Sequence, residues 1–338
     1  MANTQYNSFW HATAPTFVAA SGEPQGHYDV AIIGAGFTGL GAARKLAKKG
    51  MGVAVLEAQS VGFGASGRNG GHLNNGLAHS FVEACASFGQ ETAIAMYRAF
   101  DDGIETIERI ADEEKIECNF RRSGKLKLAS KPKHMIEIRK NFDALNALVD
   151  PETTLLTRDE LSEEIGSSAF HGAMLQPRSA MMHMGRFATG LAEAASRYGA
   201  SIFEASPVIQ CLPDAKGCRL ATPAGTITAQ KVLLATGAYT TPNFHWFRRR
   251  IIPVGSFLIA TRPLTDDEVR LTLPGNRTCV TTMNIGNYFR LSADNRMIFG
   301  GRARFSARSD QQSDAKAGKL LQAAMSHIFP HLAEIEID

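Results

Sequence analysis

The chain has 338 residues, of which 44% are hydrophobic and 20% are charged. This composition excludes a disordered chain and allows about two domains with a large core. The formal net charge of +3 is too small to indicate a nucleic-acid-binding protein. Glycine is unevenly distributed: 12 of the 31 glycines lie between Gly34 and Gly76, so we expect the chemistry of the protein in that segment.

The spacing of the cysteine and histidine residues indicates the cellular compartment of the protein and whether it binds a metal ion. The five cysteines include no Cys-x-x-Cys pair, which favours reduced thiols in a cytoplasmic protein over a disulfide framework. Residues 1–17 lack the basic and apolar regions of a signal peptide, and no apolar run reaches the roughly 20 residues that span a bilayer. The ten histidines are dispersed, and His171 and His183 have no partner at ligand spacing. We expect no metal site and no membrane span.

The first elements predicted along the chain form a strand–helix–strand unit. Residues 1–27 are polar, contain Pro and Gly, and are predicted to form an N-terminal arm. Residues 29–33 read as a buried strand that ends at glycines, residues 40–49 as a helix, and residues 53–56 as a second buried strand. Such a unit is typical of a parallel sheet.

The rest of the chain changes character after residue 237. Apolar residues at three- and four-residue steps predict a helix over 90–116, and shorter helices are expected at 133–149, 158–165 and 185–198. Strands are expected at 124–129, 201–203 and 231–237. Short strand candidates then follow without helices between them, which predicts an antiparallel sheet; they are residues 251–261, 278–282, 288–291 and 297–300.

A dinucleotide fingerprint lies between the first strand and the first helix. Gly34, Gly36 and Gly39 follow the pattern Gly-x-Gly-x-x-Gly, and Glu57 ends the next strand. In this pattern the first glycine permits a tight turn, the second lets the backbone approach a pyrophosphate, and the third brings helix and strand together. The helix N-terminus favours the pyrophosphate, and Glu57 can bind ribose hydroxyls.

A second glycine-rich loop, residues 62–71, follows the second strand directly. A nicotinamide dehydrogenase has no evident use for it, whereas FAD is extended and needs a further backbone cradle. Arg68 and Asn69 stand between glycines, where we expect them to neutralise phosphate or to hydrogen-bond the flavin ring. The alternative interpretation is a flexible surface loop.

The segment Gly64-Ala-Ser-Gly-Arg-Asn-Gly-Gly71, after the pair Asp29 and Glu57, resembles the FAD-dependent D-amino-acid oxidase/glycine oxidase superfamily. Within it the sequence is most like the gamma-glutamylputrescine oxidoreductase branch, and looser similarity extends over nearly the whole chain. The resemblance implies non-covalent FAD. The implied cofactor-binding residues are Gly34, Gly36, Phe37, Thr38, Gly39, Glu57, Ala58, Gly64, Ala65, Ser66, Arg68, Asn69, Gly70, Gly71, Val208, Thr236 and Gly237.

The resemblance also implies the fold. We expect an α/β protein, α+β overall, in which a Rossmann-like FAD-binding domain is interleaved with an antiparallel-sheet substrate domain. The FAD-binding domain is assigned to residues 28–82, 170–248 and 300–338, and the substrate domain to 83–169 and 249–299. The superfamily carries a Gly-rich closing segment that is not found between Gly301 and Asp338. We therefore expect either a fragment or a truncated product that holds FAD poorly.

The implied reaction is oxidation of a carbon–nitrogen bond of an amine or amino acid, such as a gamma-glutamylputrescine-like substrate. A hydride equivalent passes to the flavin, the imine is hydrolysed, and oxygen or another acceptor takes the electrons. Arg290 and Tyr288 are candidates for holding a substrate carboxylate, and His72 for facing the ring or substrate. Two alternatives remain open, a D-amino-acid or sarcosine-type dehydrogenase and a non-catalytic flavin-binding remnant.

Overall fold

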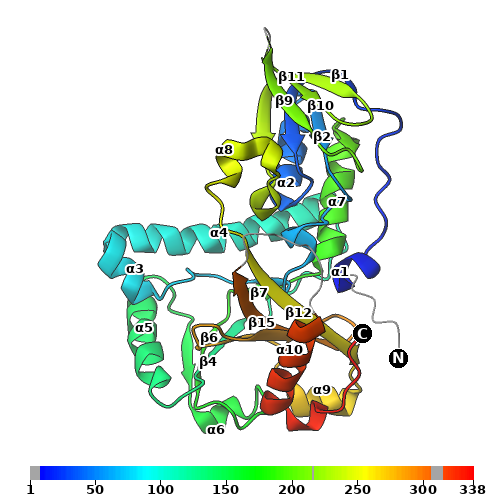
Figure 1. The fold of residues 1–338 in the computed structure, drawn as a ribbon. Coiled ribbons are helices and arrows are strands. Elements are labelled where there is room, and N and C mark those ends of the chain that lie inside the picture. The colour runs from blue at the N-terminus through cyan, green and yellow to red at the C-terminus, as the bar shows by residue number, and fades with distance from the viewer. Residues whose placement is uncertain (1–7, 215–216, 306–314) are drawn as a thin grey trace.

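The computed structural model describes residues 8–214, 217–305 and 315–338, which form two sheet-based bodies joined by a long helix (Figure 1). The upper body in Figure 1 contains a six-stranded sheet. Its strands, in spatial order, are β8 (Ser201–Phe203), β2 (Val53–Leu56), β1 (Gln25–Ile33), β11 (Thr226–Leu234), β10 (Gly217–Ala221) and β9 (Gln210–Asp214).

The first four strands of this sheet are parallel, and β10 and β9 add an antiparallel edge. The strand–helix–strand prediction is confirmed, because β1 and β2 flank α2 (Phe37–Ala47). α2 and α7 (Met184–Arg197) pack together and bury their small residues against the sheet. Every residue of β2 is buried, as expected for a parallel strand that is covered on both faces.

The lower body contains a seven-stranded sheet. Its strands, in spatial order, are β12 (Val254–Pro263), β15 (Arg296–Phe305), β14 (Tyr288–Leu291), β13 (Thr278–Thr281), β4 (Lys125–Leu128), β6 (Ala173–Gln176) and β5 (Thr154–Leu156). The expected antiparallel block is confirmed, since β12, β15, β14 and β13 pair antiparallel in that order. β4 joins β13 in parallel, so the whole sheet is mixed. The expectation of no helix within the block was wrong, because α9 (Asp266–Thr272) lies between β12 and β13. The missed signal for α9 is the capping box formed by Thr265 and Glu268.

The predicted helix over 90–116 is confirmed as α4 (Gln90–Glu114), which runs between the two bodies (Figure 1). Near its start, Tyr97 packs in the core of the lower body with α3 (Phe81–Phe88) and α5 (His134–Leu148). At its end, the Glu114 carboxylate accepts a hydrogen bond from Nε of the buried Arg44 on α2 at 2.7 Å. The helix therefore fixes the position of one body against the other. Three further helices have four residues each; they are α1 (Phe9–Ala12), α6 (Arg158–Leu161) and α8 (His245–Arg248).

The C-terminal segment does not lie where the sequence assignment put it. α10 (Ala315–Ile328) packs on β12 and β15, and Leu321 and Met325 share a core with Phe289 and Phe299. Residues 315–338 thus cover the lower sheet rather than the upper one, and β6, also assigned to the FAD-binding domain, pairs within the lower sheet. The apolar face of α10 is visible in the sequence, but which sheet it covers depends on long-range packing.

Candidate cofactor and active site

The loops singled out by sequence meet at one edge of the six-stranded sheet. The parallel strands β1, β2, β8 and β11 all end there, and their carboxyl ends are followed by the segments that carry the candidate residues. Adjacent ends are tied together: the Gly34 amide donates to the Leu56 carbonyl at 2.9 Å, and the Ala235 amide donates to the Ile33 carbonyl at 2.9 Å. In open parallel sheets this edge is where ligands bind.

The first glycine loop has the geometry that its pattern predicts. Gly34 has φ +107°, and a Cβ there would lie 2.8 Å from the Ala235 carbonyl oxygen. A Cβ on Gly39 would collide with the Gly34 carbonyl oxygen, so only glycine lets α2 approach β1 this closely. Gly36 caps α2 without a side chain, and Thr38 is exposed in the first turn. The N-terminus of α2 is therefore open to an anionic ligand.

Glu57 is fixed at the end of β2. Its Oε2 accepts a hydrogen bond from the Ala35 amide at 2.7 Å, and its Oε1 accepts one from the Gln59 amide at 2.9 Å. Each carboxylate oxygen can accept a second bond, which suits ribose hydroxyls. Ala58 beside it is exposed.

The ends of β8 and β11 complete this edge. Val208 is buried in the core cluster that contains the last residues of β1 and β2. Thr236 forms a side-chain hydrogen bond with Thr240 at 2.6 Å, and Gly237 has φ +51°. The sequence-predicted residues from four separated segments are therefore brought to one edge of one sheet.

The second glycine loop is held in shape by its own polar side chains. Asn69 Nδ2 donates to the Ala65 and Ser66 carbonyls at 3.1 and 3.0 Å, and Asn69 Oδ1 accepts from the Gly71 amide at 2.9 Å. Arg68 Nε donates to the Phe63 carbonyl at 2.7 Å, with its guanidinium over the Phe63 ring. Arg68 Nε and the Asn69 carboxamide therefore hold the loop in shape, and direct contact of these two side chains with phosphate or flavin stays a prediction.

Two contacts dock this loop against the first loop and against the end of β11. Ser66 Oγ accepts a hydrogen bond from the Phe37 amide at 3.0 Å, at the start of α2. A Cβ on Gly64 would lie 3.1 Å from the Tyr239 ring. The second loop therefore lies beside the N-terminus of α2, as one extended ligand in contact with both loops requires.

The N-terminal arm seals the other side of the second loop. Trp10 Nε1 donates to the Asn69 carbonyl at 2.6 Å, and His11 Nε2 lies 3.0 Å from the Gly62 carbonyl oxygen. Ser8 Oγ donates to the Gly67 carbonyl. The sequence marked residues 1–27 only as a polar arm; the docking of this arm on the second glycine loop is visible only in the structure.

Tyr288 and His72 lie together where the second loop meets the seven-stranded sheet. A Cβ on Gly70 would lie 2.8 Å from the Tyr288 ring, and a Cβ on Gly300 would collide with it, so the ring fits only between glycines. The Tyr288 hydroxyl lies 3.0 Å from Ser256 Oγ, and the His72 ring meets Tyr288 edge-on with centroids 5.6 Å apart. We call His72, Tyr288 and Ser256 the ring cluster; the sequence missed Ser256.

The ring cluster contains unused hydrogen-bonding atoms. Both His72 ring nitrogens are buried and have no partner among the residues that the structure describes. Burial, with smaller contributions from the Arg290 and Lys125 charges, lowers the pKa of His72 to about 3, so the imidazole is neutral at physiological pH. Burial likewise raises the pKa of Tyr288 above its usual range. The cluster thus offers neutral donors and acceptors beside the glycine loop.

Arg290 has a different environment from the one expected for a substrate-binding arginine. It is only 3% exposed, and its Nε donates to the Gly70 carbonyl at 2.8 Å while its Nη2 donates to the Met182 carbonyl at 2.7 Å. Gly71, with φ +71°, leaves the space that the guanidinium occupies. Two of its N–H groups therefore tie the second glycine loop to Met182, which lies just before α7.

An open helix N-terminus, a fixed carboxylate and two glycine loops at one edge of a parallel sheet define a dinucleotide-binding protein. The sequence also matches the family described as FAD dependent oxidoreductase over residues 29–338, and the chain belongs to that family. It is accordingly an FAD-dependent oxidoreductase.

Individual relatives agree with this membership. The chain is 33% identical to a probable oxidoreductase, OrdL, of Haemophilus influenzae over 92% of this chain and 72% of the relative. It is 31% identical to gamma-glutamylputrescine oxidoreductase of Escherichia coli, over the same shares. The crystal structure of glycine oxidase from Geobacillus kaustophilus superposes with a TM-score of 0.72 at 23% identity, covering 92% of this chain and 80% of that one. The last similarity confirms the fold.

No helix among residues 8–214, 217–305 and 315–338 combines the length and apolar character of a membrane span. In the same residues, no three His, Cys, Asp or Glu side chains are grouped so that they could hold a metal ion.

Proposed function

We propose that the enzyme oxidises a carbon–nitrogen bond of a small amine or amino acid, with gamma-glutamylated amines such as gamma-glutamylputrescine as the preferred class. The proposal rests on two contacts: Ser66 links the two glycine loops, and Gly70 of the second loop lies against the Tyr288 ring of the ring cluster. The residues that would bind FAD therefore lie next to those that would bind a substrate. The 31% identity with gamma-glutamylputrescine oxidoreductase supports the substrate class.

FAD fits the residues of the sheet edge without a covalent bond. The first turn of α2 would hold the pyrophosphate, Glu57 would hold the ribose, and the backbone of residues 64–71 would lie along the extended cofactor. The bound flavin supplies a two-electron acceptor. Arg68 and Asn69 contribute by shaping the loop, because their hydrogen bonds run to the loop's own backbone.

The ring cluster is suited to an amine because its groups are neutral. A buried imidazole with two unsatisfied nitrogens can accept a hydrogen bond from a substrate nitrogen and donate one to a substrate oxygen. Tyr288 stays protonated, since burial raises its pKa, and its ring can orient the substrate. The cluster would thus position the carbon next to nitrogen, and no side chain has to remove a proton from it.

The visible spectrum of purified protein, with and without added FAD, tests the cofactor. Flavin absorption bands that disappear when the protein is denatured and filtered support non-covalent FAD. Protein that stays colourless after incubation with FAD would overturn the enzyme proposal and favour a non-catalytic remnant.

Anaerobic bleaching then tests the substrate class. Gamma-glutamyl-polyamines, free polyamines, D-amino acids and N-methyl amino acids are compared at equal concentrations. The proposal expects the fastest bleaching with the gamma-glutamyl compounds. Faster bleaching by D-amino acids or by sarcosine would replace the proposed substrate with one of those two.

His72→Leu separates the role of the imidazole from folding. Losing one hydrogen bond to a polar substrate group lowers kcat/KM roughly 10-fold or more, with the flavin spectrum unchanged. Ser80→Ala, which removes the N-cap of α3 on the other sheet-based body, is the control for general loss of stability. Unchanged kcat/KM in His72→Leu would remove His72 from the substrate site.

A further inference from the structure

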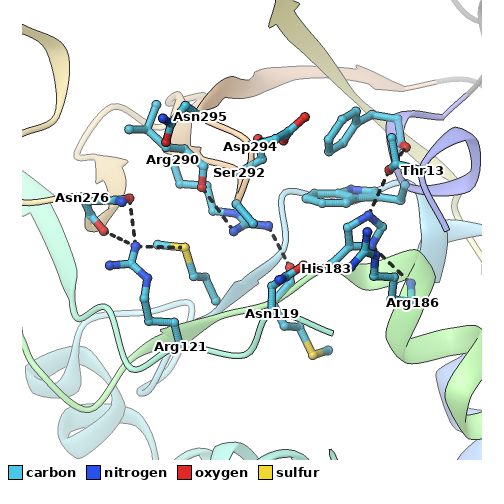
Figure 2. Close-up of a pocket in the computed structure, with 16 residues that line it drawn as sticks. Thr13, Asn119, Arg121, His183, Arg186, Asn276, Arg290, Ser292, Asp294 and Asn295 are labelled. Atoms are coloured by element: carbon cyan, nitrogen blue, oxygen red, sulfur yellow. Dashed lines mark hydrogen bonds between the residues drawn. The ribbon is translucent and has the colours of Figure 1, made fainter. Parts of the chain in front are cut away.

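A separate cavity of about 210 Å³ lies between the N-terminal arm, the start of α7 and the turn between β14 and β15 (Figure 2). Of the side chains that contact the second glycine loop, Arg290 and Trp10 line it. The cavity shares no wall with the first glycine loop, with Glu57 or with the ring cluster. The function proposed above leaves it without a role.

The charges that line the cavity are unbalanced. Arg121, Arg186 and Arg290 all line it, and none of them forms an ion pair with any of the described residues. The lining carboxylate, Asp294, is already paired with Arg296 at 2.8 Å. Burial, and to a smaller extent the nearby Arg121 charge, lowers the pKa of Arg290 to about 9.

The neutral residues of the cavity add donors. Asn276 Oδ1 accepts from Arg121 at 2.8 Å and Asn119 Oδ1 accepts from Arg186 at 3.5 Å, which leaves both carboxamide NH₂ groups as donors for a ligand. Arg186 Nε is buried and has no partner among the described residues. Figure 2 shows Arg121, Arg290 and Arg186 in succession across the pocket, with these asparagines beside the outer two.

We propose that this cavity, the arm pocket, binds a small oxyanion, carried by a carboxylate or a phosphate group. Three arginines and two carboxamide groups present many donors against few free acceptors, and planar guanidinium groups match both kinds of oxyanion. A volume of about 210 Å³ is below the roughly 300–1,000 Å³ of drug-sized sites, which limits the ligand to a small molecule.

A bound oxyanion would stabilise the second glycine loop through the side chains that contact both the loop and the cavity. Arg290 contacts the Gly70 carbonyl, and Trp10, which also lines the cavity, contacts the Asn69 carbonyl. An oxyanion that neutralises the arginines would hold both contacts in place. Binding of an anion in the arm pocket would therefore affect the second glycine loop through two side chains, Arg290 and Trp10.

The test is thermal unfolding of the FAD-saturated enzyme at constant ionic strength, with phosphate, citrate or chloride added in increasing amounts. Saturating FAD occupies the pyrophosphate site, which could otherwise bind the same anions. We expect a saturable rise in Tm with phosphate or citrate but not with chloride. A response to phosphate alone assigns a phosphate ligand, and a response to citrate alone assigns a carboxylate ligand.

Arg186→Gln and Arg121→Gln localise the effect, and Arg139→Gln, which removes an exposed charge on α5, is the matched control. Losing one charged hydrogen-bonding partner should raise the half-saturating concentration roughly 10-fold or more, while the control responds like the wild type. No saturable response in the wild type, or the same midpoint in the wild type and both variants, would overturn the proposal. If FAD fails to bind, the proposed function fails, yet the same comparison without FAD still decides the arm pocket.

Discussion

Replacing Arg290 with Met would distinguish a structural role of this arginine from a substrate-binding role. The variant keeps an unbranched side chain but loses the donors to the Gly70 and Met182 carbonyls, at 2.8 and 2.7 Å. Each buried carbonyl left without a donor costs about 1–3 kcal/mol, and part of this is offset because a buried charge is removed. We expect a net loss of about 3 kcal/mol in the free energy of unfolding.

Differential scanning fluorimetry measures this loss as a fall in Tm of about 5 °C or more. Weaker FAD retention should accompany it, because the Gly70–Gly71 backbone is released. Arg290→Lys keeps the charge but only one compact donor group, so its Tm should lie between those of the wild type and Arg290→Met. A normal Tm with normal flavin content, together with a KM raised at least 10-fold only for substrates with a carboxylate, would refute the structural role.

Three further predictions follow from individual contacts. Gly39→Ala should abolish FAD binding, because its Cβ collides with the Gly34 carbonyl oxygen of the first loop. The control is Gly41→Ala on the same helix, whose Cβ meets no atom within 4 Å and which should bind FAD normally. Equal flavin content in the two variants would contradict the close-packing argument. Trp10→Phe leaves the partly buried Asn69 carbonyl of the second loop without its donor, so urea unfolding should show a loss of about 1 kcal/mol, and FAD should dissociate faster. Burial lowers the pKa of Lys125 to about 7 in the folded protein, whereas the same lysine in the unfolded chain stays protonated up to about pH 10. Between pH 7 and 10 the unfolded state therefore binds more protons than the folded state, and the free energy of unfolding rises with pH. Relative to Lys125→Met, the unfolding free energy of the wild type should rise by up to about 1.4 kcal/mol per pH unit between pH 7 and 10; a constant difference would count against a buried lysine.

The local elements were predictable because their signals lie within a few turns of chain. The fingerprint from Gly34 to Glu57 combines a strand, a tight turn and a helix within about 30 residues, and the structure places every part of it as the pattern requires. The helix over 90–116 was predictable for the same reason, from one apolar face. The missed helix α9 has seven residues and too little periodicity, although its capping box could have revealed it.

The roles of the polar side chains were less predictable. Arg68, Asn69 and Arg290 were expected to meet cofactor or substrate, and the sequence did not indicate that all three also donate hydrogen bonds to backbone carbonyls. A sequence shows that a polar group is present, but the partner that satisfies it is decided when the group is buried.

The sequence by itself determined the class of cofactor and the edge of the sheet that meets it, because glycine conformations and strand ends are local properties of the chain. Tertiary structure decided which segments surround that edge. Arg290 reaches a carbonyl 220 residues away, α10 covers the lower sheet instead of the upper one, and the arm pocket draws on the arm, α7 and the β14–β15 turn. These contacts depend on how distant apolar faces pack together, and no local pattern records that choice.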